Sequence, residues 1–214
     1  SGIKKVDIAK RNVDRIGLGT LVLRYPKHIT NEQVAKELRR CDIIFGCTDK
    51  QQPRSILVQL ALRYLIPVID TGVVIESAKG TITDVVGRVT TLLAGEACLF
   101  CRKRITPQGI QLESLSKEER ASLAREGYAP ELDAPAPAVV PFTSSIASFA
   151  VSEFLHRLTG YMGGDRYSSE LLCFFDQNRL RTNRLEPDAN CLCAQRSIWG
   201  RGDSVPFLNI AWGT

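Results

Sequence analysis

The sequence predicts an α/β fold in which helices cover a doubly wound sheet with an antiparallel extension. Helical and strand-like patterns alternate over residues 5–70, and this alternation is typical of parallel sheets with helices on their faces. The apolar run at 43–45 suits a strand that is buried on both sides. Two stretches rich in β-branched residues, 80–86 and 87–93, are separated by a glycine and predict an antiparallel extension of the sheet.

A helix and a strand are expected before residue 26. Apolar residues at helical spacing predict an amphipathic helix: Val6, Ala9, Val13 and Ile16. Gly17 and Gly19 close this pattern as C-terminal stops. Residues 21–25 alternate well enough to predict a strand.

Two helices and two strands are expected between residues 30 and 70. Thr30 and Gln33 form a capping box, which predicts a helix running to about Arg40. The elements predicted after it are a strand at 42–46, a helix at about 53–64 with Pro53 in its first turn, and a strand at 67–70.

The remainder of the chain is expected to complete a single domain spanning 1–214. Residues 102–141 are polar, with a charged helix near 116–126 and a Pro/Ala stretch, and predict a crossover or mobile loop. The elements predicted after this loop are a helix at about 144–159, a strand pair at 170–176 and 179–185, and an irregular tail at 194–214.

Charge and composition argue against some classes of protein. The net charge of +5 comes from 28 Lys and Arg against 23 Asp and Glu, without a basic block of five, so nucleic-acid binding is only a weak option. No apolar run reaches the ~18 residues of a membrane-spanning helix and no signal-peptide pattern occurs, so a cytoplasmic protein is expected. Seven cysteines in such a protein indicate buried thiols or a metal site rather than disulfides.

Polar residues follow the predicted buried strand at 42–46. Thr48 and Asp49 fall just past its carboxyl end, which is the edge where open α/β sheets bind ligands. A carboxylate there is placed to meet a metal–phosphate group. The alternative is that Asp49 is a plain helix N-cap.

Four cysteines form two close pairs, Cys98 with Cys101 and Cys191 with Cys193. Two pairs of thiolates predict a tetrahedral zinc site, which is structural because four thiolates leave no open position for a substrate. The second pair has one intervening residue where two are usual. The alternative is that these residues are small buried apolar side chains.

Lys5 is the remaining candidate ligand-binding residue. No glycine-rich phosphate-binding motif occurs in the sequence, so any phosphate contact must come from elsewhere. Lys5 opens the first predicted helix, where its ammonium could lie beside nucleotide phosphates. The alternative is an ordinary solvent-exposed lysine.

Taken together, these patterns resemble the ThiF/MoeB/HesA and ubiquitin-activating enzyme superfamily of adenylyltransferases, which act on ubiquitin-like and sulfur-carrier proteins. The resemblance covers nearly the whole chain in order. The matching pieces are Gly2-Ile-Lys-Lys-Val6, the run 41–54 with its Cys-Thr-Asp-x-x-x-x-Arg core, Ile66-Pro-Val-Ile-Asp-Thr-Gly72, Cys98-x-x-Cys101, Phe154-Leu-His-Arg-Leu-Thr-Gly160 and the late cysteine pair.

The resemblance implies a Rossmann-like sheet and a set of residue roles. Lys5 contacts ATP phosphates, Asp49 holds the magnesium–ATP complex, and Arg54 supports the turn that carries Asp49. The four cysteines bind zinc, and the protein is a dimer. The implied reaction is attack of a partner's C-terminal glycine carboxylate on the α-phosphate of ATP, which positioning and charge stabilisation suffice to promote.

The sequence departs from the family pattern in three respects. The glycine-rich loop of the family lies upstream of Ser1, so the sheet is expected to be incomplete at its N-terminal side and the natural gene to encode that loop. Lys50 replaces the Asn that usually follows the Asp. The crossover 102–141 has no cysteine to form a thioester, and its charged residues could instead help to dock the partner.

Two other functions stay open on the sequence. One is the related ATP-dependent dehydratase that cyclises a modified tRNA base, which the positive charge permits. The other is a non-catalytic pseudo-enzyme that acts as the scaffold of a heterodimer. The presence of Lys5 and Asp49 favours catalysis, whereas the missing nucleotide loop favours the scaffold.

Overall fold

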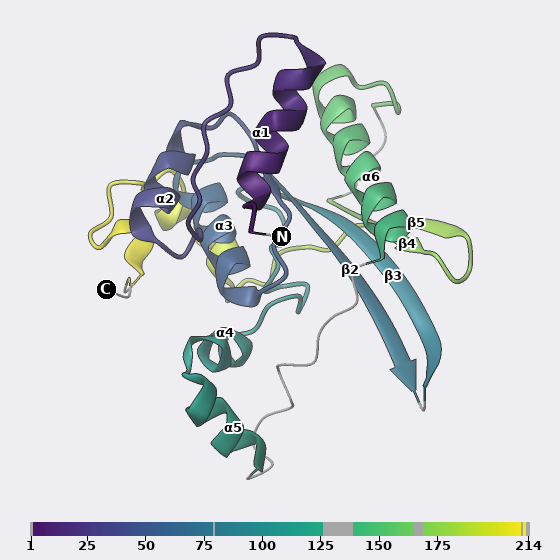
Figure 1. Ribbon diagram of the computed structural model, residues 1–214. Helices are drawn as coiled ribbons and strands as arrows, with labels where there is room; N and C mark the ends of the chain where they lie inside the picture. The colour runs from purple at the N-terminus through teal and green to yellow at the C-terminus, as the bar shows by residue number, and fades with distance from the viewer. Residues whose placement is uncertain (1, 79, 126–138, 165–168, 211, 213–214) are drawn as a thin grey trace.

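The chain forms a mixed five-stranded sheet with helices on both faces (Figure 1). The computed structural model describes residues 2–78, 80–125, 139–164, 169–210 and 212. The strands lie in chain order: β1 (Ile44–Gly46), β2 (Val68–Ala78), β3 (Thr81–Leu92), β4 (Glu170–Phe174) and β5 (Arg179–Asn183). β1 and β2 are parallel, and each later strand is antiparallel to the one before it.

Helices occupy the segments between and around the strands. The α-helices are α1 (Lys5–Ile16), α2 (Glu32–Glu37), α3 (Gln51–Arg63), α4 (Pro107–Ser114), α5 (Lys117–Arg125) and α6 (Val140–Thr159). Short 3₁₀ turns are η1 (Leu38–Arg40), η2 (Leu192–Ala194), η3 (Arg196–Ile198) and η4 (Phe207–Asn209). The α/β class is confirmed, and the elements follow the predicted order apart from the strand expected at 21–25, which does not form, and the helix α4, which was not predicted.

The two faces of the sheet are covered by different helices. α3 is apolar around most of its circumference and packs with Val68 and Leu92 in the larger core cluster. α6 covers the opposite face, where Ile146 and Ala150 pack against residues of β2, β3 and β4. Figure 1 shows α3 and α6 on either side of the strands, with α4 and α5 extending away from the body.

The predicted break between two antiparallel strands at Gly87 is wrong. β2 and β3 form one long hairpin, and Gly87 lies inside β3, paired with Val73. A Cβ atom on Gly87 would collide with the Ile146 side chain of α6. The glycine therefore allows α6 to approach the sheet closely and does not mark a turn.

Two further expectations near the N-terminus fail. Residues 21–25 form no strand, and Leu21 is 83% exposed, because no strand among the described residues lies beside them to supply a ladder or a core. The second helix is capped by Asn31, whose side chain accepts the Val34 N–H, rather than by Thr30. Asn is as good an N-cap as Thr, and Asn31 has the extended backbone that the cap requires.

Several helix ends and the closing strand pair follow the predictions. α1 ends at Gly17 and α6 at Gly160, both in the left-handed conformation expected of glycine after a helix. The β4–β5 hairpin lies within the predicted 170–176 and 179–185, and the described residues of the tail form 3₁₀ turns and no longer helix or strand. Most of the predicted Pro/Ala stretch lies outside the described residues. Among the described helices, none combines the length and the apolar composition needed to cross a bilayer.

Candidate functional site

The carboxyl end of β1, beside the first half of β2, carries the predicted site. Asp49 is exposed in the loop between β1 and α3. The Thr71 hydroxyl donates a hydrogen bond to the Gly46 carbonyl at 3.2 Å, which ties the end of β1 to β2. Gly46 has no space for a side chain, because a Cβ would lie 2.7 Å from Leu57 and 3.2 Å from the carboxylate of Asp70.

A buried cluster of charges lies directly behind this edge. Asp70 is fully buried and accepts a 2.6 Å hydrogen bond from Arg88. Arg54, from the first turns of α3, forms a 3.5 Å ion pair with the other Asp70 oxygen and bonds to the Thr71 carbonyl. Both guanidinium groups lie against Gly72, where a Cβ would come within 3.2 Å of Arg88 and 3.3 Å of Arg54. The predicted Arg54 thus anchors the start of α3 to the start of β2.

Burial and charge shape the ionisation of this cluster. Burial raises the pKa of Asp70, and the two neighbouring guanidinium groups oppose that effect. Burial also lowers the pKa of Arg54, while the negative charges of Asp70 and, more weakly, Asp49 favour its charged form. Two guanidinium groups share the buried Asp70 carboxylate, and the nearby carboxylates of Asp49 and Glu113 also favour the charged form of Arg54.

Polar side chains continue across the sheet in a single row. Asp70, Thr90, Glu170 and Asn183 pair in register on adjacent strands. The Thr90 hydroxyl accepts from Arg88 at 3.1 Å and donates to Glu170 at 3.1 Å. Asn183 donates to Glu170 at 2.9 Å. We call these five residues, Asp70, Arg88, Thr90, Glu170 and Asn183, the polar row.

The far end of the polar row reaches the loop of the first cysteine pair. Arg102, next to Cys101, forms a 3.2 Å ion pair with Glu170 and donates to the Ala97 carbonyl. Burial alone would raise the pKa of Glu170, but the Asn183 hydrogen bond and the charges of Arg104 and Arg102 bring it below its ordinary value. The polar row therefore connects the Asp49 edge to the cysteine loop.

The structure brings the four predicted cysteines together. The Sγ atoms of Cys98, Cys101, Cys191 and Cys193 all lie within 4.8 Å of one another. The shortest separations are 3.5 Å between Cys98 and Cys191 and 3.4 Å between Cys101 and Cys193. A tetrahedral site with metal–sulfur bonds of about 2.3 Å needs sulfur atoms about 3.8 Å apart, so this cluster can hold a metal ion.

Hydrogen bonding and burial shift the pKa values of the cluster thiols in opposite directions. A hydrogen bond from Cys98 lowers the pKa of Cys193 to about 5. The same interaction raises the pKa of Cys98, and burial raises that of Cys191 to about 11. The backbone N–H of Asp188 also points at the Cys101 sulfur, at 3.4 Å.

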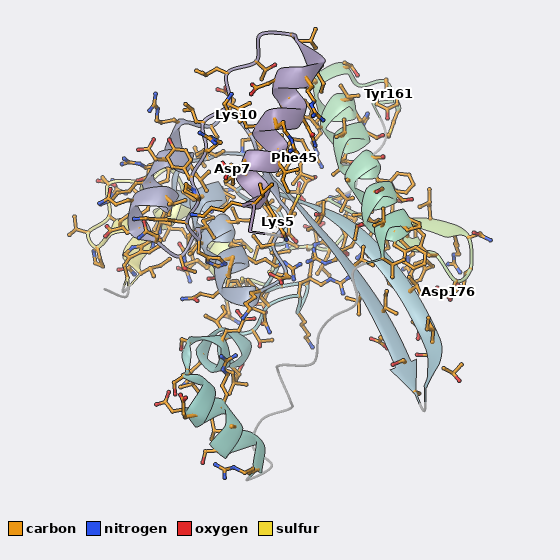
Figure 2. The ribbon with its side chains drawn as sticks, in the orientation of Figure 1. Lys5, Asp7, Lys10, Phe45, Tyr161 and Asp176 are labelled. Atoms are coloured by element: carbon orange, nitrogen blue, oxygen red, sulfur yellow. The ribbon has the colours of Figure 1, made fainter. Side chains whose placement is uncertain are left out.

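Lys5 lies in the first turn of α1, at the end of the helix that points toward the body of the molecule (Figure 2). It is exposed. Within the described part of the chain, no hydrogen bond or ion pair joins Lys5 to Asp49 or Arg54. The structure therefore brings Arg54 close to Asp49 but leaves the role of Lys5 a prediction.

Sequence reasoning missed the buried partners of Arg54. Asp70 was recognised only as part of a matching segment, and Arg88 and Glu170 were not singled out. An arginine inside a β-branched strand was the available signal, because a charge at an inward position must be paired. The partner could not be chosen without the strand register.

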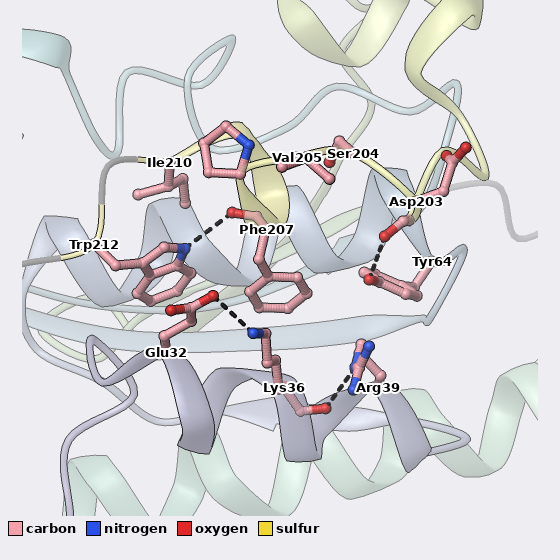
Figure 3. A pocket seen from close by; sticks show the side chains of 12 residues that line it. Glu32, Lys36, Arg39, Tyr64, Asp203, Ser204, Val205, Phe207, Ile210 and Trp212 are labelled. Atoms are coloured by element: carbon pink, nitrogen blue, oxygen red, sulfur yellow. Dashed lines mark hydrogen bonds and ion pairs between the residues drawn. The ribbon is translucent and has the colours of Figure 1, made fainter.

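A pocket of about 510 Å³ opens elsewhere, between α2 and the C-terminal tail (Figure 3). Lys36 and Arg39 both lie 5.6 Å from the centre of the Phe207 ring, and Trp212 stacks on the same ring. Glu32 neutralises Lys36 at 2.8 Å. None of the predicted site residues lines this pocket.

Because α3 and α6 cover opposite faces of a sheet whose first two strands are parallel, the chain is an α/β protein of the Rossmann-like class. The model of the ThiF family matches residues 1–195. The chain therefore belongs to the ThiF family.

Solved structures show the same fold. E. coli MccB with AMPCPP and SeMet MccA superposes with a TM-score of 0.63 at 12% identity, covering 91% of this chain and 52% of that chain. E. coli MccB with ATP superposes with a TM-score of 0.59 at 11% identity, covering 90% of this chain and 51% of that chain. SeMet PaaA superposes with a TM-score of 0.52 at 17% identity, covering 86% of this chain and 55% of that chain. The chain thus spans about half the length of the MccB chains. No protein of curated function matches the sequence.

Proposed function

We propose that this chain carries part of an ATP-dependent adenylation site that acts on the C-terminal glycine of a ubiquitin-like or sulfur-carrier protein. The observation that carries the proposal is the exposed Asp49 at the end of β1, backed by the arginine-rich cluster at Arg54, Asp70 and Arg88. Membership of the ThiF family and the similarity to MccB, solved with ATP and with MccA, support the reaction class.

Each residue has a defined task in this proposal. Asp49 holds the magnesium–ATP complex, and Lys5 contacts the phosphates. Arg54 fixes the first turns of α3 against β2 and keeps positive charge near Asp49. When bound, Mg²⁺ supplies charge neutralisation at the phosphates.

The chemical step needs positioning more than side-chain chemistry. A carboxylate oxygen of the carrier attacks the α-phosphorus of ATP, the bond to the β-phosphate bridging oxygen breaks, and pyrophosphate leaves. The products are an acyl-adenylate and pyrophosphate. Lys5 and bound Mg²⁺ would stabilise the charge that develops on the phosphate oxygens, so no nucleophile from this chain takes part.

We further propose that the cysteine cluster holds one structural Zn²⁺ per chain. The four sulfur atoms fit a tetrahedral site and leave no position for a substrate. Because Cys191 and Cys193 lie in the tail and the other two cysteines follow β3, the site pins the tail to the sheet. We also expect a cytoplasmic homodimer from the family resemblance.

The Asp49→Asn variant tests the adenylation proposal. In the complete protein we expect carrier-dependent ATP–pyrophosphate exchange to fall about 100-fold, since the amide loses a charge contact to the metal-bound nucleotide. The melting temperature should change little, because the Asp49 side chain is exposed and does not cap α3, whose N-cap residue is Lys50. A panel of ubiquitin-like proteins ending in Gly-Gly supplies the carrier.

Asp42→Asn is the matched control, because Asp42 is an exposed acid just before β1, at the opposite end of the strand. This variant should catalyse ATP–pyrophosphate exchange at the wild-type rate. If Asp49→Asn also catalyses ATP–pyrophosphate exchange at that rate, Asp49 has no role at the nucleotide and the non-catalytic scaffold becomes the better function.

A further inference from the structure

Helix α3, which follows Asp49 directly, lacks an N-cap side chain of its own. Its N-cap residue is Lys50, whose backbone is extended and whose side chain makes no capping hydrogen bond. An ammonium group can only donate, so it cannot accept the free N–H groups of a first helical turn. Pro53 has no N–H, which leaves Gln51 and Gln52 as the first donors to satisfy.

Glu113, in the last turn of α4, supplies the missing cap from the crossover segment. Its two carboxylate oxygens accept the backbone N–H groups of Gln51 and Gln52, each at 2.9 Å. The carboxylate also lies at the positive end of the α3 dipole, where negative charge is stabilising. Glu113 is half-buried, so solvent screens this interaction only in part.

A second contact joins the same two helices, and here a side chain of α3 accepts a backbone N–H at the start of α4. The Gln51 side-chain oxygen accepts the Thr106 N–H at 2.8 Å, at the start of α4. Thr106 in turn caps α4 by accepting the Gly109 N–H. Gly109 leaves room for the Gln51 side chain, with which a Cβ would collide. Each helix start is therefore held by the other helix.

We propose that Glu113 is a positioning residue for Asp49, taking the place of the N-cap that Lys50 cannot provide. The proposal rests on the proposed function for the role of Asp49, but the cap itself does not. Only one residue separates Asp49 from the first amide that Glu113 holds. A first turn of α3 that frays would let the Asp49 carboxylate leave the position in which it meets the nucleotide-bound metal.

The test compares Glu113→Ala with a variant that restores a local cap. Asn at position 50 can accept the Gln52 N–H, so Lys50→Asn in the Glu113→Ala background should rescue the defect. Glu118→Ala is the matched control, since Glu118 is an exposed acid on the neighbouring helix α5. All variants are made in the complete protein.

Two measurements are made on each variant. Hydrogen exchange, resolved to single amides, reports the cap, and calorimetric titration with Mg·AMPCPP reports the nucleotide site. In Glu113→Ala we expect exchange at Gln51 and Gln52 to accelerate at least about 10-fold and Mg·AMPCPP affinity to fall about 10-fold. In the double variant, affinity should return to within about 3-fold of wild type, and Glu118→Ala should match wild type in both.

The outcomes separate this inference from the proposed function. Unchanged amide exchange in Glu113→Ala would show that the cap does not form. Faster exchange with unchanged affinity would make Glu113 a structural cap only, and failure of Lys50→Asn to rescue would exclude capping as the cause. If the wild-type protein binds no Mg·AMPCPP, the nucleotide roles of both Asp49 and Glu113 are overturned, while amide exchange still decides the cap.

Discussion

Asp70→Asn is expected to lower the free energy of unfolding by about 3–5 kcal/mol, which is typical when one partner of a buried ion pair is removed. Asn has nearly the same shape as Asp, so packing is retained. Arg88 and Arg54 would then keep two charges in a site that is almost closed to water, without the carboxylate that compensates them. Urea unfolding followed by circular dichroism measures the loss.

Two companion variants show whether charge is the cause. Asp84→Asn changes the same residue type at a half-buried position of β3 and should cost no more than about 0.5 kcal/mol. Combining Asp70→Asn with Arg88→Met removes one of the two uncompensated cations and should recover part of the stability. A double variant less stable than Asp70→Asn alone would contradict the charge explanation.

Removal of zinc from the cysteine cluster is expected to destabilise the protein by at least about 4 kcal/mol, or roughly 10 °C in melting temperature, because metal affinity contributes directly to folding. Beyond Cys193 the tail carries the buried Leu208, and the Trp199 indole donates to the Cys193 carbonyl. Loss of the metal should therefore release this part of the tail. Elemental analysis should find about one zinc per chain before chelation.

Cys193→Ser and Cys41→Ser make a matched pair for the zinc prediction. Cys193 belongs to the cluster and its variant should lose the metal, whereas Cys41 is half-buried outside the cluster and its variant should keep it. A purified protein without metal, whose melting temperature is unchanged by chelation, would rule out the zinc site.

The elements that local sequence could predict are those whose pattern does not depend on distant partners. The apolar run before Gly46, the helix at 51–63 and the glycine stops of α1 and α6 are specified by residues close to one another. The segment 21–25 failed because an alternating pattern forms a strand only beside another strand. Gly87 was misread because its neighbour, Ile146, lies about 60 residues away in sequence.

The candidate site was predictable only where its residues stand in short local motifs. Asp49 and the cysteine pairs stand in short motifs, and the structure gathers the cysteines as expected. Glu113 could not be assigned, because a glutamate in a polar crossover segment carries no signal until α4 is docked on α3. The N-cap alternative for Asp49 is wrong, because the N-cap residue of α3 is Lys50. The ligand roles of Asp49 and Lys5 stay predictions that the ATP–pyrophosphate exchange experiment tests.

The polar row also constrains how the strands can align. Shifting β3 by one residue relative to its neighbours would send Arg88 and Thr90 to the face covered by α6, among Ile146 and Ala150. Asp70 and Glu170 would then face apolar residues as unpaired buried charges, at a cost of several kcal/mol. The hairpin of β2 and β3 is long and rich in similar β-branched residues, which by themselves tolerate slippage. The buried charges thus make a one-residue slip between β2 and β3 unfavourable and stabilise the observed register.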